Sequence, residues 1–477
     1  MQRTFSTFCV LTAIRKAAIL ATAVLVVFIS ACDSSSSPAL VDPVDPVVPV
    51  VPVVPADPPV AVDPGDSSGV NGPANQMSSS QVIAQSAIAT ERFGEIRERR
   101  LADDPSSEVT DAVVTAINDF SLVLHRAQAN DQPDENAVAS GYSMATALSF
   151  LRAGAAGATD SELANLLAQD AIDETSVHRS FNALAQTLAT RNNEELVLNT
   201  ANRIFAQPDL PLKTGFLDIA TGEYAAPVTE VDFANATQPA IDLINEWASE
   251  QTDGFIKEIA DNTNITETTQ VALLNAIFLD AAWQQQFDDL SEQFFTVANG
   301  DIKRVPTFGG ERTLARSVES DVTVVDIPYA GGELSMMIMM PDDLASFEST
   351  FSVARLNSIV SSLQSVRVAY SMPAFEIESL LDANKLLEPI GLPVQDLDLS
   401  DMFDSLDQEL ELTVQQKARI EVDQNGTRAA AVTTVGVGIT SVAQLENISI
   451  DKPFLYLLRD TTTGVILFSG RVVDPSL

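Results

Sequence analysis

Residues 420–435 read Ile-Glu-Val-Asp-Gln-Asn-Gly-Thr-Arg-Ala-Ala-Ala-Val-Thr-Thr-Val. The segment begins like a strand, reaches Gly426, and continues in small and β-branched residues without a turn signal. Every second residue after that glycine is small or apolar, namely Thr427, Ala429, Ala431, Thr433, Val435, Val437 and Ile439. This alternation is typical of a half-buried strand, whereas the glycines and polar residues beyond it are typical of an exposed loop. We interpret the segment as one that could occupy two states. The alternative is an ordinary strand followed by a flexible loop.

The composition of the chain excludes several classes of function. The 477 residues include 66 Asp and Glu against 27 Lys and Arg, so the formal net charge is −39. This charge disfavours binding to nucleic acid or to an anionic membrane surface. The two cysteines lie within the first 32 residues, and the two histidines, His125 and His178, lack the spacing of metal ligands. We therefore expect no disulfide in the folded part, no metal site and no cofactor.

The N-terminal end has the pattern of an export signal. Two basic residues precede an apolar run over residues 17–29, which is too short to span a membrane comfortably and predicts a signal peptide over residues 1–31. The run ends in Ile-Ser-Ala before Cys32, which resembles the lipobox of bacterial lipoproteins. The resemblance implies lipid attachment at Cys32 and a secreted chain anchored in the bacterial cell envelope, on its periplasmic face or at the cell surface. The alternative is a plain signal peptide that happens to contain a cysteine.

Residues 32–106 are predicted to be a tether and polar linker, not a domain. Val-Pro and Asp-Pro repeats occupy much of the stretch from Val41 to Pro64. Frequent proline forbids a helix and favours an extended, semi-rigid spacer. The one regular element expected in the linker is a short helix within residues 81–100.

Residues 107–477 are predicted to form one large folded domain, since roughly 370 residues can bury a sizeable core. Helices are predicted over 109–127, 143–152 and 241–250, and a capping box at Thr159-Asp160-Ser161-Glu162 predicts the start of another. Strands are predicted over 196–205, 271–279, 322–327, 334–340, 366–370 and 410–422, with a hairpin over 454–459 and 465–473. Strands and helices do not alternate. The predicted fold class is therefore α+β, with N-terminal helices and a large, mainly antiparallel sheet.

The order of motifs along this domain resembles the serpin family, and the likeness covers essentially all of residues 107–477. Nine segments carry it, in family order and with near-normal spacing: Asn136–Ser143, Gly154–Thr159, Ile244–Gly254, Leu274–Phe278, Ile327–Tyr329, Met372–Phe375, Gly426–Ala431, Pro453–Tyr456 and Gly470–Pro475. The resemblance implies a serpin-like fold with an exposed, mobile reactive-centre loop. It also implies that the chain is not an enzyme but a monomeric suicide inhibitor of serine proteases, whose partner is the protease held as a covalent acyl-enzyme.

The resemblance also assigns roles to residues of the opening segment. The hinge of the loop corresponds to Gly426, Thr427, Ala429, Ala430 and Ala431. The loop after Gly426 is expected to be held out as bait, and residues 427–439 are expected to insert into the main sheet once a protease has cut the loop. Small side chains in the hinge favour that insertion. In the inserted strand, alternation is expected to point the charged Arg428 to solvent.

Counting from the hinge, as in the family, predicts the reactive bond at Thr440–Ser441. Counting back from Pro453 moves the bond by two residues, so Ile439 and Val442 remain alternatives. A small or β-branched residue before the cut suggests an elastase-like or subtilisin-like protease. It argues against a trypsin-like enzyme, because the chain has no Lys or Arg from residue 429 to residue 451.

A buried polar cluster beneath the sheet corresponds to Ser140, Ser143, Asn275 and Gln416. Gln416 stands where the family has a histidine, and it can form hydrogen bonds but cannot titrate. The chain departs from the family pattern at three other positions. Gln424 replaces a glutamate, Arg428 stands where an acidic residue is frequent, and Gly141 replaces a proline.

Two other functions stay open. A non-inhibitory serpin-fold binding protein would more often carry proline or large charged residues at positions 429–435, and none occurs there. An envelope serine hydrolase is suggested by Gly-Tyr-Ser-Met-Ala over residues 141–145, with Ser143 as nucleophile. That segment lacks the final glycine of the nucleophile-elbow motif.

Overall fold

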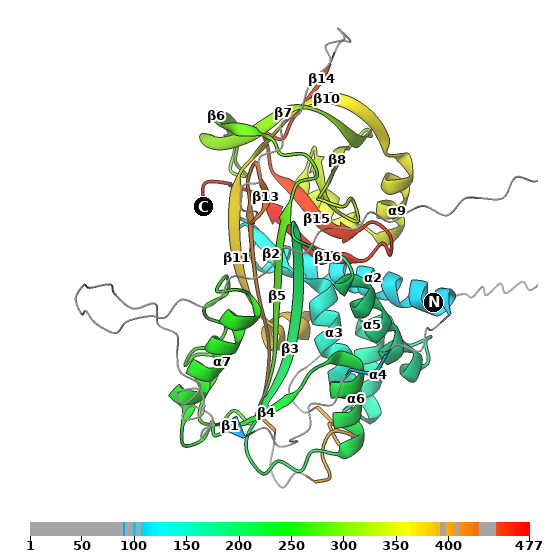
Figure 1. Cartoon of the computed structure of the whole chain (residues 1–477), viewed down its shortest axis with the longest axis vertical. Helices are drawn as coiled ribbons and strands as arrows, with labels where there is room; N and C mark the ends of the chain where they lie inside the picture. Colours follow the sequence, from blue (N-terminus) through cyan, green and yellow to red (C-terminus); the bar gives the residue numbers. More distant parts are fainter. Residues whose placement is uncertain (1–88, 91–98, 102–105, 392–396, 406–409, 429–444) are drawn as a thin grey trace, which may run out of the picture. The chain divides into compact units, whose positions relative to one another are not determined.

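The computed structural model describes residues 89–90, 99–101, 106–391, 397–405, 410–428 and 445–477 (Figure 1). The chain divides into units 1–74 and 75–477, and every described residue belongs to the second unit. Several predicted sites lie outside the described residues, namely Cys32, Ala429, Ala430, Ala431, Ile439, Thr440, Ser441 and Val442.

The helices are α2 (Ser107–Asp131), α3 (Gly141–Arg152), α4 (Gly157–Leu166), α5 (Glu174–Ala189), α6 (Thr214–Tyr224), α7 (Thr237–Gln251), α8 (Leu344–Thr350), α9 (Val353–Ser362) and α10 (Ala383–Leu387), the last followed by a 3-10 turn over Glu388–Ile390. The three helices predicted by position are confirmed as α2, α3 and α7. The predicted capping box is wrong, because α4 begins at Gly157 and the Thr159 hydroxyl accepts a hydrogen bond from the Asp398 backbone N–H (2.9 Å). Within the described residues, no helix is both long enough and apolar enough to cross a membrane.

The strands form two sheets, so the expectation of a single large sheet is refined, and the α+β class is confirmed. The seven-stranded sheet has the order β1 (Ala89–Thr90), β4 (Val228–Val231), β3 (Leu196–Ala206), β5 (Val271–Ala282), β13 (Gly426–Thr427), β12 (Leu412–Val422) and β11 (Phe375–Asp382). The nine-stranded sheet has the order β14 (Glu446–Ser449), β10 (Gln364–Pro373), β7 (Ile302–Val318), β8 (Val322–Pro328), β9 (Leu334–Pro341), β15 (Phe454–Asp460), β16 (Ile466–Val472) and β2 (Ala137–Ala139), and β6 (Asp288–Thr296) pairs with β7.

Strand β5 lies at the centre of the seven-stranded sheet and is covered on both faces. Leu273 and Ile277 pack into the main core together with residues of α3, whereas Ala272 and Leu274 pack into a second cluster with Ile244 of α7. Figure 1 shows α7 lying against this sheet. Burial on both faces explains why the sequence of β5 reads as a nearly continuous apolar run.

The segment that precedes α2 is packed against the domain. Ala89–Thr90 forms strand β1 antiparallel to β4, so the short helix predicted within residues 81–100 does not include these two residues. Residues 81–88 and 91–98 of that prediction lie outside the described residues. Arg99 donates from Nε to Oδ1 of the buried Asn182 (2.6 Å). Arg100 donates from Nη1 to Oε1 of the buried Glu223 (2.9 Å). These contacts extend the packed chain to the N-terminal side of residue 107.

Candidate functional site

The two central strands of the seven-stranded sheet pair directly with each other at one end only, which we call the zipped region. Strands β5 and β12 pair in parallel over Val271–Ala276 and Leu412–Lys417. At the other end, β13 lies between them and runs antiparallel to both: Thr427 pairs with Ala281 of β5 and with Val422 of β12 (Figure 1). Between these two paired regions, residues 277–280 and 418–421 have no ladder partner across the gap in the described part of the chain.

The expectation that the loop is held out after Gly426 is therefore corrected at Thr427. Gly426 and Thr427 already form a two-residue strand within the sheet, and Thr427 is only 2% exposed. A tight turn delivers them there. The Asp423 carboxylate Oδ1 accepts from the backbone N–H groups of Asn425 (2.7 Å) and Gly426 (3.3 Å). An aspartate that bonds its own following backbone in this way mimics a backbone turn.

The same turn is tied to the end of β5 by Trp283. Its backbone N–H donates to the Asn425 carbonyl (2.9 Å), and its indole Nε1 donates to the Asp423 carbonyl (2.8 Å). The backbone N–H of Phe287 donates to the Gln424 carbonyl (3.0 Å). The path of the chain into the sheet is thus held by three hydrogen bonds from one short segment.

Tyr329 contacts both Trp283 and Thr427 at the hinge. Its ring stacks on Trp283 with the ring centroids 4.5 Å apart. Its hydroxyl lies 2.6 Å from Oγ1 of Thr427, and both side chains are buried. Burial raises the pKa of Tyr329 well above its ordinary value, although the bond from Thr427 acts in the opposite direction. The phenol therefore stays protonated and can donate to, or accept from, the threonine.

The structure brings together the predicted polar cluster at the end of the zipped region. Gln416 accepts at Oε1 from the Ser140 N–H (2.8 Å) and donates from Nε2 to the Ser140 carbonyl (2.9 Å). The same Nε2 donates to Oδ1 of Asn275 (3.3 Å), its register partner on β5. Asn275 in turn donates to Oδ1 of Asn202 (2.8 Å). The cluster spans β12, β5 and β3 and includes the start of α3.

Ser143 joins this cluster through its backbone, because its N–H donates to Oγ of Ser140 (3.1 Å). The Ser143 Oγ is buried and has no hydrogen-bond partner among the described residues. Neither histidine serves it as a base, since His125 bonds to Glu348 (3.0 Å) and His178 bonds to Tyr224 (2.6 Å). The described residues therefore do not form the nucleophile and base arrangement that a serine hydrolase needs.

The glycine that replaces a family proline has a steric explanation. A Cβ atom at Gly141 would lie 2.1 Å from Oγ of Ser121 in α2. Such a contact is far too short for any side chain at this position. The close approach of α2 and α3 therefore accounts for this departure from the family pattern.

Arg428, which is expected to face solvent once the strand is inserted, packs against two aromatic rings in the uncut chain. Its backbone turns into the left-handed region (φ 48°), so the strand alternation ends at Thr427. Its guanidinium lies over the rings of Phe255 (4.6 Å) and Phe278 (4.8 Å). Nη1 and Nη2 donate to the backbone carbonyls of Thr252 and Asp253, each at 3.2 Å.

Arg419 of β12 approaches the same aromatic ring from the other strand. Its guanidinium lies 4.5 Å from the ring centroid of Phe255, and its Nη1 donates to the Phe255 carbonyl (3.0 Å). Phe255 also makes an edge contact with Phe278 of β5, with the ring centroids 5.6 Å apart. We call Phe255, Phe278, Arg419 and Arg428 the arginine–phenylalanine cluster. No sequence motif points to this cluster, because Phe255 belongs to a loop with no motif of its own.

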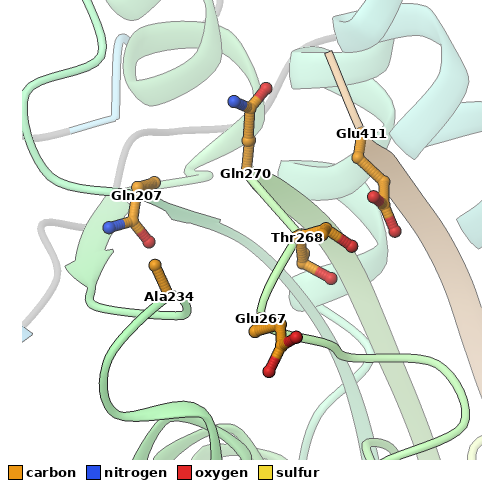
Figure 2. Close-up of a pocket in the computed structure, with 7 residues that line it drawn as sticks. Gln207, Ala234, Glu267, Thr268, Gln270 and Glu411 are labelled. Carbon is orange, nitrogen blue, oxygen red and sulfur yellow. The ribbon is translucent and has the colours of Figure 1, made fainter. Parts of the chain in front are cut away.

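A cavity lies at the zipped end of the two strands (Figure 2). Its volume is about 520 Å³, and its lining residues are Gln207, Ala234, Glu267, Thr268, Thr269, Gln270 and Glu411. Gln270 and Glu411 immediately precede β5 and β12, and the Gln270 N–H donates to the Glu411 carbonyl (3.1 Å). The cavity and β13 thus mark opposite ends of the same pair of strands.

Comparison with known proteins gives consistent matches. The family model described as "Serpin (serine protease inhibitor)" matches residues 115–475. The leukocyte elastase inhibitor of Sus scrofa is 30% identical over 377 residues, which covers 75% of this chain and 97% of that protein. Among solved structures, native tengpin, a thermophilic serpin, has a TM-score of 0.71 at 24% identity and covers 81% of this chain and 99% of its own. Thyroxine-binding globulin in complex with thyroxine has a TM-score of 0.68 at 25% identity, covering 76% of this chain and 99% of its own.

Proposed function

Because this chain belongs to the serpin family, we propose that it inhibits serine proteases by covalent trapping, through cleavage of its own loop and insertion of that loop between β5 and β12. The observation that carries the proposal is β13. Two residues of the proposed bait segment already lie between the two strands that would have to separate. The start of the inserted strand therefore exists in the uncut chain.

The register of β13 supports a specific path for the rest of the segment. If the pairing of Thr427 with Ala281 and Val422 continues down both strands, Thr433 would lie between Asn275 and Gln416. Those two residues face each other where β5 and β12 pair directly, so the two extrapolations agree. Val437 would then lie between Val271 and Leu412, where the zipped region begins. An inserted strand from Thr427 to Val437 would span roughly 36 Å at ~3.3 Å per residue.

This path supports the proposed position of the reactive bond. The cut must lie beyond Val437 if the inserted strand is to fill the whole length of the gap. Thr440–Ser441 meets this condition, as do the alternatives Ile439 and Val442. The end of the strand, with the protease still attached, would arrive near the cavity at the start of β5 and β12.

Insertion would release enough free energy to hold a protease in a distorted state. Each new ladder hydrogen bond contributes about 0.5–1.5 kcal/mol net, and an inserted strand forms such bonds on both sides. The face that runs from Thr427 to Ile439 would also be buried against the core below the sheet. Cleavage is what frees the segment to make these contacts.

We propose an elastase-like or subtilisin-like target. The absence of Lys and Arg from residue 429 to residue 451 argues against a trypsin-like enzyme. The relatives named as leukocyte elastase inhibitors support the same choice. We also propose that the mature chain is a monomer, lipid-anchored through Cys32 after removal of residues 1–31 and tethered to the bacterial cell envelope by residues 32–106.

The test is to mix the purified chain with pancreatic elastase or subtilisin and to look for a detergent-resistant complex. Mass spectrometry of the released C-terminal peptide then identifies the reactive bond. The variant Ala431→Arg should convert the inhibitor into a substrate, because residue 431 would face the core once inserted. Asn447→Arg adds the same side chain at an exposed position of β14, beyond every candidate reactive bond, and should leave complex formation intact. Cleavage of the unmodified chain without any complex would favour a non-inhibitory, serpin-fold binding protein instead.

A further inference from the structure

The arginine–phenylalanine cluster bridges the part of the gap that has no ladder pairing. Phe278 belongs to β5 and Arg419 to β12, and Phe255 contacts both from the loop that follows α7. Arg428 adds the hinge itself to this bridge by lying over both rings. Phe255 and Phe278 are 6% and 4% exposed, whereas the side chains of Arg419 and Arg428 are 25% and 26% exposed, so the rings are shielded from water and the cations partly so. Cation–π contacts are stronger when water is excluded from them.

The cluster stands directly in the path of a third inserted residue. To extend β13, Arg428 must leave the left-handed conformation and become extended. Its side chain must also give up the carbonyls of Thr252 and Asp253. The cluster therefore opposes insertion beyond Thr427 while the loop is uncut.

In the uncut chain Nη2 of Arg428 lies 3.8 Å from Oδ2 of Asp253. Burial raises the pKa of Asp280, and the charge of Arg428 already opposes that rise. The extended strand would place Arg428 between two carboxylates. Continuing the register of Thr427 brings residue 428 between Asp280 of β5 and Glu421 of β12. The backbone N–H of Arg428 already donates to the Glu421 carbonyl (2.8 Å). Two carboxylates would thus flank a guanidinium on the same strand surface, which is a favourable cross-strand arrangement. An acidic residue at position 428, as is frequent in the family, would be repelled by the same pair.

We propose that Arg428 is a positioning residue with two alternative sets of contacts, which we call its first and second seats. In the first seat, on Phe255 and Phe278, it stops the hinge after two inserted residues. In the second seat, between Asp280 and Glu421, it supports the fully inserted strand. This inference rests on the proposed function, since it concerns the same insertion. It explains why this chain combines a basic residue in the hinge with acidic residues at both flanking positions. It also implies that the uncut chain resists insertion through contacts that cleavage does not itself remove.

The first seat can be tested without any protease. A fluorescent synthetic peptide with the sequence of residues 429–440 is offered to the full chain, and the rate at which it anneals into the sheet is measured. Arg428→Gln and Phe255→Leu should each anneal the peptide about tenfold faster than the unmodified chain, because each removes a partly shielded cation–π contact. Arg428→Lys, which keeps a cation, should restore a rate within about threefold of the unmodified chain.

The matched control is Arg304→Gln, which removes a cation lying over Phe294 (5.1 Å) away from the gap. It should leave the annealing rate unchanged. Thermal unfolding of each uncut variant shows whether it is folded. An annealing rate for folded Arg428→Gln within twofold of the unmodified chain would overturn the first seat.

The second seat is tested by Asp280→Asn combined with Glu421→Gln. Cleavage of the loop should raise the Tm less in this double variant than in the unmodified chain. An equal rise in both would overturn the second seat. The inference and the proposed function can fail separately. If the unmodified chain forms no complex with any protease, the inhibitory function is contradicted. The first seat is still supported if Arg428→Gln anneals the peptide faster than the unmodified chain.

Discussion

The hydroxyl groups of Tyr329 and Thr427 lie 2.6 Å apart inside the core and join the start of the hinge strand to a ring that stacks on Trp283. No covalent link or charge is involved. Thr427, the second residue of β13, is therefore held by a neutral hydrogen bond, and the strength of that bond can be measured by removing either partner.

We expect Tyr329→Phe and Thr427→Val each to lower the free energy of unfolding by about 1 kcal/mol. Each variant leaves the opposite hydroxyl buried without a partner. The double variant should cost less than the sum of the two, with a coupling energy of about 0.5–1.5 kcal/mol. Urea unfolding of the four chains measures the cycle. Strict additivity would show that the two hydroxyls do not interact.

Thr433 is predicted to support only the inserted state. Its hydroxyl would arrive between the amides of Asn275 and Gln416, whose mutual hydrogen bond the inserted strand must replace. Thr433→Val should therefore leave the uncut chain unchanged and destabilise the cleaved chain by about 1–2 kcal/mol. Thr434→Val is the control, because alternation turns residue 434 to the other face. Denaturant unfolding of cut and uncut chains gives both values, and an equal loss for the two variants would contradict the register.

Gln416→His should make stability depend on pH where the native chain has no titrating group in this cluster. Gln416 is 0% exposed, and burial disfavours a charged imidazole, so the pKa of the new histidine should fall below its unfolded value. The unfolded chain then binds more protons, and stability is lost as pH falls from about 6.5. The unfolding free energy of the variant, relative to that of the native chain, should decrease between pH 7.5 and pH 5. A constant difference between the two unfolding free energies across that range would falsify the predicted lowering of the histidine pKa.

The chain that begins at Ser107 should be less stable than the chain that begins at Arg99. Removal of the two arginines leaves Asn182 without the guanidinium of Arg99, and leaves the buried Glu223 without its cation. We expect a loss of about 1–3 kcal/mol in the free energy of unfolding, since a buried polar group is left under-satisfied. Equal denaturation midpoints for the two chains would indicate that the segment contributes no stability.

The sequence predicts the parts of the site that depend on local pattern. Strand β5 has an apolar run that only a strand covered on both faces would carry. The polar cluster around Gln416 follows from family motifs, and the structure brings its members into hydrogen-bonding distance. The loop positions from Ala429 to Val442 stay predictions, because they lie outside the described residues.

The rest depends on tertiary contacts that no local pattern encodes. Arg428 belongs to an alternating segment, yet a single left-handed residue ends that alternation. Its partner Phe255 lies in a loop far away in the sequence, so nothing in the hinge points to it. Strand β6 was missed because most of its residues are exposed, including Phe294 at 63%, so its sequence shows no buried face.

The parallel pairing of β5 with β12 favours insertion of an antiparallel strand between them over its removal. Parallel ladders are slightly less stable per residue than antiparallel ones, and this seam is parallel. In the proposed insertion, a strand antiparallel to both neighbours would replace this one parallel ladder by two antiparallel ladders. Removal of the inserted strand would require both antiparallel ladders to break before the parallel ladder could form again. On the proposed function, insertion is therefore irreversible, and each molecule would trap a single protease.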